Sequence, residues 1–316
     1  ILDRQALALA VRLGIAVNAG SLDMLEQLGA EAPGHPVWLR VNPGFGHGHS
    51  RKTNTGGEHS KHGIWWEQLP EAYRLLDRHE LDLVGLHMHI GSGVDYQHLA
   101  QVAGAMRDTV LRSGRDVRAV SAGGGLTIPY RRGDGEIDTN RYFDAWDRSR
   151  QEIARALGHP VRLEIEPGRY LVAQAGVLVA EVRAVKDQGR NRFVLVDAGF
   201  NDLLRPALYG AHHEISVLRP DGTPREGGER ETVVAGPLCE SGDVFTQDAG
   251  GEVAPIVLTE AEVGDLLVFR DAGAYGAAMS SNYNSRPLAP EVLVDGEEVR
   301  LIRRRQTIED LLALEI

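Results

Sequence analysis

The stretch LVGLHMHIGS, residues 83–92, carries the features that decide the fold. Its first eight residues form a mostly apolar run, and Gly91-Ser92 ends the run with turn-forming residues. Helical periodicity flanks the stretch at 67–79 and at 96–113. An apolar strand between two amphipathic helices is typical of a parallel sheet that is buried on both faces.

The same alternation of helix and strand continues on both sides. Further strands are predicted at 15–18, 37–42, 117–122 and 161–166, and further helices at 3–13, 21–28 and 140–157. Ser21 is placed to cap the second of these helices. The pattern predicts an α/β fold in which about five βα units surround a parallel sheet.

From about Tyr170 the pattern changes to short alternating runs between Gly, Pro and Asp. These runs are GVLVAEVRAV (176–185), RFVLVDAG (192–199), ETVVAG (231–236) and DLLVFRDAG (265–273). Alternation with a period of two predicts a second, mainly antiparallel β domain. We therefore expect two domains, residues 1–169 and 170–316, with an exposed loop at 219–230.

Composition excludes several classes of protein. The 316 residues include 34 Lys and Arg against 45 Asp and Glu, a net charge of −11, which argues against binding to nucleic acid or an anionic membrane surface. One cysteine forms no internal disulfide, and no apolar run approaches the roughly 18 residues of a membrane span. A cytoplasmic protein acting on a small molecule is the expectation.

A long loop at 43–63 contains four histidines, His47, His49, His59 and His62. Their spacing fits no zinc-finger or helical metal-binding pattern, so we predict no metal site. We expect the segment to lie over the edge of the sheet where the strands end.

Each predicted parallel strand ends in polar or glycine-rich residues, and the carboxyl ends of barrel strands share the face that binds ligands. Gly123-Gly124-Gly125 follows one strand and can present backbone N–H groups to an anion such as a phosphate. Glu166 ends another strand, and a carboxylate held there can keep a pyridine nitrogen protonated. The structural alternative for Glu166 is a salt bridge with the nearby Arg169.

The only cysteine lies in the run GPLCESGD (236–243). A lone cysteine is more often a buried apolar residue than a reactive group, but the polar neighbours here argue against burial. Nearby carboxylates disfavour a thiolate, so Cys239 suits proton donation better than nucleophilic attack.

With these residues assembled, the whole chain resembles the diaminopimelate decarboxylase family, pyridoxal phosphate enzymes of the alanine racemase and ornithine decarboxylase fold group. The resemblance rests on HIGS (89–92), GGG (123–125), EPGR (166–169), RPALY (205–209), CESGD (239–243) and GAYG (273–276). It implies a (β/α)8 barrel, incomplete in this chain, followed by the β domain. It also implies decarboxylation of meso-2,6-diaminopimelate to L-lysine and CO2, the last step of lysine biosynthesis.

The resemblance assigns roles to particular residues. The residues implied to bind the cofactor are His89, which would stack on its ring, Ser92, Gly124, Glu166, which would pair with the pyridine nitrogen, Gly168, Arg169 and Tyr275. The residues implied to bind substrate are Arg169, Arg205, Tyr209, Tyr275 and Glu240. Cys239 would donate a proton, with Glu240 beside it, across the interface of a homodimer that shares its active sites. Two guanidinium groups suit a substrate with carboxylates at both ends.

One departure concerns lysine. The family carries its Schiff-base lysine on the first barrel strand, and the five strands found here match the fourth to eighth. Lys52, Lys61 and Lys186 are the chain's only lysines, and none has a matching context. We expect the 316 residues to be part of a longer protein and to be inactive alone.

Two alternatives stay open at the level of sequence. One is decarboxylation of another basic amino acid or of a carboxylated polyamine on the same fold. The other is a catalytically silent binding protein, which the absence of a matching lysine allows. The Arg205 and Tyr209 pair, and Glu240 beside Cys239, favour diaminopimelate.

Overall fold

The computed structural model describes residues 2–46, 54–91 and 96–316, which form two compact units. Unit 1 comprises Ile1–Thr127 with Glu136–Gly168, and unit 2 comprises Ile128–Gly135 with Arg169–Ile316. The short segment Ile128–Gly135 thus leaves the first unit to make its contacts within the second. The division into domains at 169/170 stays a prediction.

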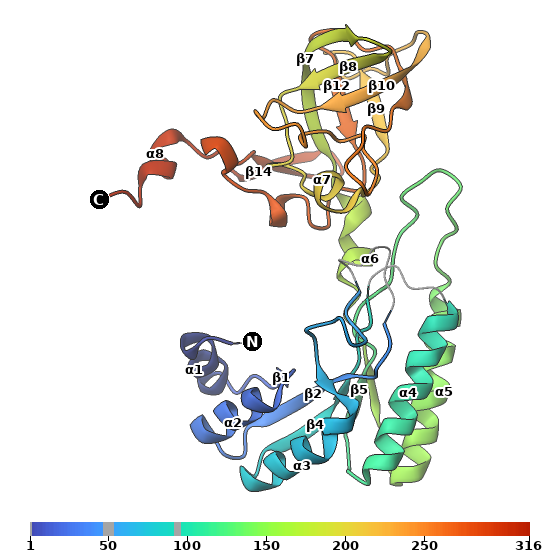
Figure 1. Ribbon diagram of the computed structural model, residues 1–316, viewed down its shortest axis with the longest axis vertical. Helices are drawn as coiled ribbons and strands as arrows, with labels where there is room; N and C mark the ends of the chain where they lie inside the picture. Colours follow the sequence, from blue (N-terminus) through green and yellow to red (C-terminus); the bar gives the residue numbers. More distant parts are fainter. Residues whose placement is uncertain (1, 47–53, 92–95) are drawn as a thin grey trace. The chain divides into compact units, whose positions relative to one another are not determined.

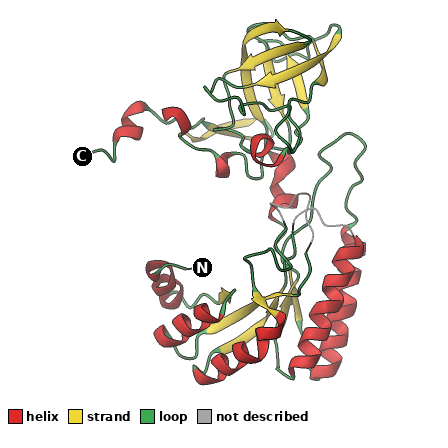
Figure 2. Cartoon of the chain, in the orientation of Figure 1, coloured by secondary structure: helices red, strands yellow, loops and turns green. Residues whose placement is uncertain are grey.

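Unit 1 is a parallel sheet covered by helices (Figures 1 and 2). Within the described ranges its strand order is β1-β2-β4-β5-β6, and a short β3 pairs with β2. The strands are β1 (Val17–Ala19), β2 (Pro36–Asn42), β3 (Ile64–Trp65), β4 (Asp82–His87), β5 (Ala119–Ser121) and β6 (Arg162–Glu164). The helices are α1 (Arg4–Arg12), α2 (Leu22–Glu31), α3 (Leu69–Arg78), α4 (Tyr96–Ser113) and α5 (Thr139–Leu157), with the 3-10 turn η2 (Trp66–Gln68).

The five predicted strands and their order are confirmed, although most are shorter than predicted. The sheet is open among the described strands, because its ladder ends at β1 and β6. Ser21 caps α2 as predicted, since its hydroxyl accepts a hydrogen bond from Met24 N–H over 3.2 Å. The sequence did not predict β3, which lies just beyond the expected loop.

Helices α4 and α5 lie side by side on one part of the unit 1 surface (Figure 1). Their inward faces contribute apolar side chains such as Met106, Trp146 and Ile153 to the core, and the strands contribute Leu39 and Leu86. All five are at most 1% exposed. Burial on both faces explains the apolar character of β4 and β5.

Unit 2 is built on a second sheet, of order β11-β10-β8-β7-β12-β9. Its strands are β7 (Leu178–Gln188), β8 (Asn191–Val196), β9 (Ile215–Leu218), β10 (Glu229–Ala235), β11 (Ile256–Thr259) and β12 (Leu266–Phe269). The pairings are antiparallel except β8 with β10, which is parallel. The prediction of a mainly antiparallel domain is confirmed. The predicted loop at 219–230 is mostly exposed, but β10 begins inside it at Glu229.

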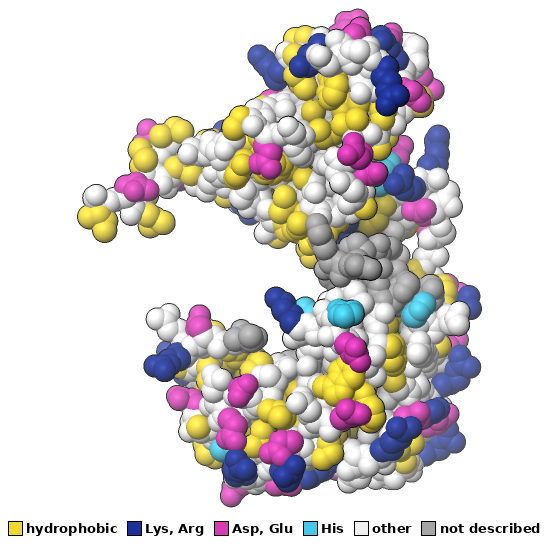
Figure 3. Space-filling model, in the orientation of Figure 1, with side chains coloured by type: hydrophobic (Ala, Val, Ile, Leu, Met, Phe, Trp, Pro, Cys, Tyr) yellow, Lys and Arg dark blue, Asp and Glu magenta, His cyan; other side chains and the backbone are white. Residues whose placement is uncertain are grey.

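Short elements complete unit 2. They are α6 (Gly168–Val172), which begins at the last residue of unit 1, α7 (Arg205–Tyr209), the hairpin of β13 (Glu291–Asp295) and β14 (Glu298–Arg303), α8 (Ile308–Leu312), and the 3-10 turns η3 (Ala173–Ala175), η4 (Ala277–Met279) and η5 (Tyr283–Ser285). On the face drawn in Figure 3, acidic and basic side chains are interspersed over each unit. Within the described residues, no helix has the length and apolarity needed to cross a bilayer.

Candidate active site

The parallel ladder of unit 1 aligns the polar residues at its carboxyl edge. Arg40 on β2 pairs in register with His87 on β4, and His87 pairs with Ser121 on β5. Ser121 pairs in turn with Glu164 on β6. Two positions further along these last three strands lie His89, Gly123 and Glu166. Residues far apart in sequence therefore become neighbours, as the shared carboxyl edge predicts.

His89 is held in one orientation and stays neutral. Gly124 N–H donates to His89 Nδ1 over 3.0 Å, and the Thr55 hydroxyl donates to the His89 carbonyl over 2.9 Å. Burial, and then the positive charge of Arg40, lower the pKa of His89 to about 4. Because Nδ1 accepts a hydrogen bond, the proton of the neutral ring sits on Nε2.

Glu166 presents a charged carboxylate at the same edge. Its Oε1 lies 3.2 Å from His87 Nε2, and its side chain is 59% exposed. The contact is a close approach rather than an aligned hydrogen bond, because neither ring nitrogen of the buried His87 has a hydrogen-bond partner of acceptable geometry among the described residues. The neighbouring His87 holds the pKa of Glu166 below its usual value, although partial burial opposes the shift.

The glycine run packs too closely against its neighbours for its residues to carry side chains. A Cβ at Gly123, where φ is +62°, would lie 2.6 Å from His89 Cβ, and a Cβ at Gly124 would lie 2.8 Å from the Glu166 carbonyl. The expectation of three bare N–H groups needs correction, because Gly123 N–H donates to Ser121 Oγ over 3.2 Å and Gly124 N–H to His89. Of the three, only Gly125 N–H has no hydrogen-bond partner within the described chain.

Arg169 is buried in unit 2 among aromatic rings. Its Nη1 donates to the Tyr130 hydroxyl over 2.6 Å, and its Cζ lies 5.0 Å from the centroid of the Tyr275 ring. Tyr275 adopts a φ of +66°, which is rare for a residue with a side chain, and is 41% exposed. Within its own unit, Glu166 lies closest to His87, and within unit 2 Arg169 bonds to Tyr130.

Arg205, at the start of α7, is the second buried arginine of unit 2. Its Nη1 lies 2.8 Å from His213 Nε2, and its Cζ lies 4.8 Å from the centroid of the Tyr130 ring. Tyr209 ends the same helix and, like Tyr130, favours the charged form of Arg205, while burial lowers the pKa of Arg205. Arg169, Arg205, Tyr209 and Tyr275 therefore form one neighbourhood of unit 2, and their role in binding substrate stays a prediction.

Cys239 and Glu240 lie in a different part of unit 2. Cys239 is exposed, as predicted, and its sulfur accepts a hydrogen bond from the Asn284 amide over 3.1 Å. The Tyr283 hydroxyl donates to Glu240 Oε2 over 2.6 Å. Within the described part of unit 2, the structure records no contact between this pair and the Arg169 and Arg205 neighbourhood.

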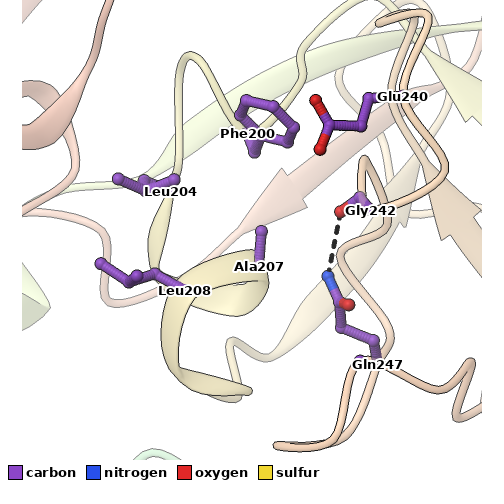
Figure 4. A pocket seen from close by; sticks show the side chains of 8 residues that line it. Phe200, Leu204, Ala207, Leu208, Glu240, Gly242 and Gln247 are labelled. Carbon is purple, nitrogen blue, oxygen red and sulfur yellow. Dashed lines mark hydrogen bonds between the residues drawn. The ribbon is translucent and has the colours of Figure 1, made fainter. Parts of the chain in front are cut away.

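A cavity of about 350 Å³ opens beside Glu240 (Figure 4). Glu240 and Gly242 lie on one side of it and Ala207 and Leu208 of α7 on the other. Gln247 closes one end, and its amide donates to the Gly242 carbonyl over 3.2 Å. The Cys239 loop thus borders an open, partly apolar cavity.

Sequence reasoning assigned no individual role to several polar residues of these neighbourhoods. They are Arg40, His87, Tyr130, His213, Tyr283 and Asn284. Two of them carried a usable signal: His87 repeats His89 at a spacing of two, and Tyr130 follows the glycine run closely. His213 lies eight residues from Arg205, and only the fold brings their side chains together.

Comparison with known proteins identifies the family to which the chain belongs. Residues 2–173 match the family described as pyridoxal-dependent decarboxylase, pyridoxal binding domain. Diaminopimelate decarboxylase of Streptomyces coelicolor is 68% identical over 316 residues, which cover 100% of this chain and 72% of that protein. Diaminopimelate decarboxylase of Escherichia coli strain K12 is 63% identical, with coverage of 100% and 76%. The chain belongs to the diaminopimelate decarboxylase family.

Solved structures of diaminopimelate decarboxylase agree. A crystal structure of one such enzyme superposes with a TM-score of 0.96 at 63% identity, covering 100% of this chain and 75% of that one. The Helicobacter pylori diaminopimelate decarboxylase complexed with L-lysine gives 0.84 at 31% identity, with coverage of 99% and 76%. The fold is therefore that of the alanine racemase and ornithine decarboxylase group, as expected.

The cofactor of the diaminopimelate decarboxylase family is pyridoxal phosphate, and the residues of unit 1 fit it. A charged carboxylate, Glu166, and a neutral imidazole with a fixed tautomer, His89, are what a protonated pyridine ring needs for pairing and stacking. The glycine run lets the backbone approach His89 and the Glu166 carbonyl closely. Gly168, whose N–H donates to the Glu166 carbonyl over 3.0 Å, completes the turn.

Some of the residues singled out from the sequence lie outside the described ranges, and others lie outside the two neighbourhoods described above. Ser92, His47, His49 and Lys52 lie outside the described residues. Lys61 is exposed on the loop before β3, and Lys186 lies on β7 of unit 2. His59 and His62 are described, and within the described chain no group of three or more His, Cys, Asp or Glu could hold a metal ion.

Proposed function

We propose that this chain carries the pyridoxal phosphate-dependent decarboxylation of meso-2,6-diaminopimelate to L-lysine. In this reaction one bond from carbon to carboxylate breaks, CO2 leaves, and a proton takes its place on carbon. The single observation that carries the proposal is the pair of buried guanidinium groups, Arg169 and Arg205, that have no Asp or Glu within 4.0 Å among the described residues. Buried cations without a carboxylate partner call for an anionic ligand.

Bound pyridoxal phosphate supplies an electron sink for the electron pair that CO2 leaves behind. Glu166 stays ionised, so it would favour a proton on the pyridine nitrogen of the bound cofactor. His89 remains uncharged and offers a flat face without opposing that proton. Arg169 and Arg205 would hold and orient substrate carboxylate, and Tyr209 and Tyr275 would line the same place.

We further propose that the protein is a homodimer with shared active sites. Cys239 would donate the proton to carbon in its partner's site, and Glu240 would bind the far amino acid end of the substrate. Two observations support this: Cys239 is exposed, and its contacts are with Asn284 rather than with the arginine neighbourhood of its own unit. A thiol that must stay protonated and unoxidised also favours a cytosolic location, which cell fractionation tests.

Lysine replacements of Arg169 and Arg205 test the site. We expect Arg205→Lys or Arg169→Lys, made in the full-length protein that contains this chain, to raise KM and lower kcat while the cofactor absorbance persists. An ammonium group cannot reproduce the planar fork of a guanidinium. Arg115→Lys is the matched control, because Arg115 makes a two-pronged pair with Asp77 on the surface. Unchanged kinetics in Arg205→Lys would remove that residue from the site.

Mixed dimers test the shared active site. Cys239→Ala should keep cofactor and dimer but lose on the order of 10²–10⁴ in rate, the usual worth of a positioned acid. Random exchange with inactive Glu166→Ala should then restore about one quarter of the wild-type rate, because half the dimers would have one intact site. Mass-tagged subunits establish the exchange. Exchange without recovery of activity would place Cys239 in its own subunit's site.

A further inference from the structure

Four side chains of unit 2 form a single connected group, which we name the arginine frame: Tyr130, Arg169, Arg205 and His213. The Tyr130 hydroxyl accepts from Arg169 Nη1 at 2.6 Å, and the Tyr130 ring lies 4.8 Å from Arg205 Cζ. The edge of the His213 ring meets Tyr130 with centroids 5.8 Å apart and planes at 76°. Tyr130 therefore touches all three other members.

The arginine frame is held together by neutral groups. Arg169 has a phenol oxygen and the faces of Tyr130 and Tyr275 as its partners. Arg205 has an aromatic face and an imidazole nitrogen. Asp271 is close enough to sense the charge of Arg205, but it is not within ion-pair distance of it. Both positive charges therefore remain uncompensated.

His213 serves as an acceptor, and its surroundings fix that role. Its Nδ1 lies 2.8 Å from the Arg270 carbonyl, which can only accept, so Nδ1 carries the proton. The lone pair on Nε2 then faces Arg205 Nη1 at 2.8 Å. Burial, with the nearby charge of Arg205, lowers the pKa of His213 to about 4, so the ring is neutral at pH 7.

Tyr130 reaches the arginine frame through an unusual path of the chain. It lies on the segment Ile128–Gly135, which leaves unit 1 and belongs by its contacts to unit 2. Ile128 of this segment packs with Ala173 and Ala274 in a small buried cluster against which Tyr130 also packs. That cluster adjoins in sequence both Arg169 and Tyr275.

We propose that Tyr130 and His213 are positioning residues that fix both guanidinium groups with uncharged partners and so reserve their charges for the carboxylates of the substrate. This inference rests on the proposed function and deepens it. A carboxylate in either position would stabilise the buried arginines equally well but would compete with the ligand. Neutral acceptors satisfy the N–H donors without that competition.

Removal of one hydroxyl tests the role of Tyr130. Tyr130→Phe in the full-length holoenzyme keeps the ring and removes the acceptor of Arg169. We expect KM for diaminopimelate and the inhibition constant of L-lysine to rise about tenfold, with unchanged cofactor absorbance and a much smaller change in kcat. Tyr142→Phe is the matched control, because the hydroxyl of the buried Tyr142 has no hydrogen-bond partner within the described chain.

Two substitutions of His213 test what a negative charge at this position does to substrate binding. His213→Gln supplies a neutral acceptor, and His213→Glu supplies one of similar reach that carries a negative charge. We expect His213→Gln to bind L-lysine within a few-fold of wild type and His213→Glu to bind it about tenfold or more weakly, although its melting temperature is no lower than that of His213→Gln.

The outcomes distinguish failure of the neutral arginine frame from failure of the proposed function. If Arg205→Lys weakens substrate binding while Tyr130→Phe behaves as Tyr142→Phe, or while the Gln and Glu variants of His213 bind L-lysine alike, the neutral frame is wrong and the proposed function stands. If Arg205→Lys also leaves binding unchanged, the arginine pair is not the substrate site and both proposals fail.

Discussion

At the scale of single residues, the two neighbourhoods share one feature, a neutral histidine whose tautomer is fixed by a backbone partner. His89 accepts at Nδ1 from Gly124 N–H and therefore carries its proton on Nε2. His213 donates from Nδ1 to the Arg270 carbonyl and therefore leaves Nε2 free to accept. The same side chain thus supplies a flat neutral face in unit 1 and a neutral acceptor in unit 2.

These assignments predict opposite tautomers in nitrogen NMR spectra of the resting protein. His89 should be protonated at Nε2 and His213 at Nδ1, and both should stay neutral down to about pH 4. Since each native pKa lies below the unfolded value of about 6.5, each ring contributes stability that is present above pH 6.5 and is lost as pH falls toward 4, about 3 kcal/mol apiece. Titration of His213 near pH 6.5 would contradict its role as an acceptor.

At the scale of elements, the sequence predicted the strands that have a clear local pattern of apolar residues. Strands β4 and β5 of unit 1 are buried over most of their length and read as apolar runs, so they were predictable. By contrast β9 and β11 are four residues each, and the β13–β14 hairpin is mostly exposed, so none leaves a strong pattern. The parallel pairing of β8 with β10 depends on chain packing that alternation does not encode.

The residues of the candidate site also divide into those that sequence motifs predict and those that only the fold reveals. Residues within recognisable motifs, such as Glu166, Arg169 and Arg205, were predicted from sequence. Tyr130 and His213 were not, because their importance lies in contacts with residues distant in sequence: Tyr130 is 39 positions from Arg169. A tyrosine beside a glycine run has many structural explanations until the chain path of Ile128–Gly135 is known.

At the scale of the whole molecule, the net charge and the site have opposite signs. The chain carries −11 overall, yet unit 2 buries two arginines that have no carboxylate partner within ion-pair distance among the described residues. The positive charge is thus local and specific rather than a surface property, which suits capture of a small dicarboxylate and not of a polyanion.

The measurement that tests the central claim most directly is the stoichiometry of products formed from meso-2,6-diaminopimelate. The full-length protein that contains this chain, purified with pyridoxal phosphate, should release one CO2 for each L-lysine formed, and it should release none from L-lysine, L-ornithine or L-arginine. Arg205→Lys, with its cofactor absorbance retained, should form both products more slowly and in the same ratio. A protein that holds the cofactor but releases CO2 from one of those amino acids, or releases none from diaminopimelate, would contradict the account.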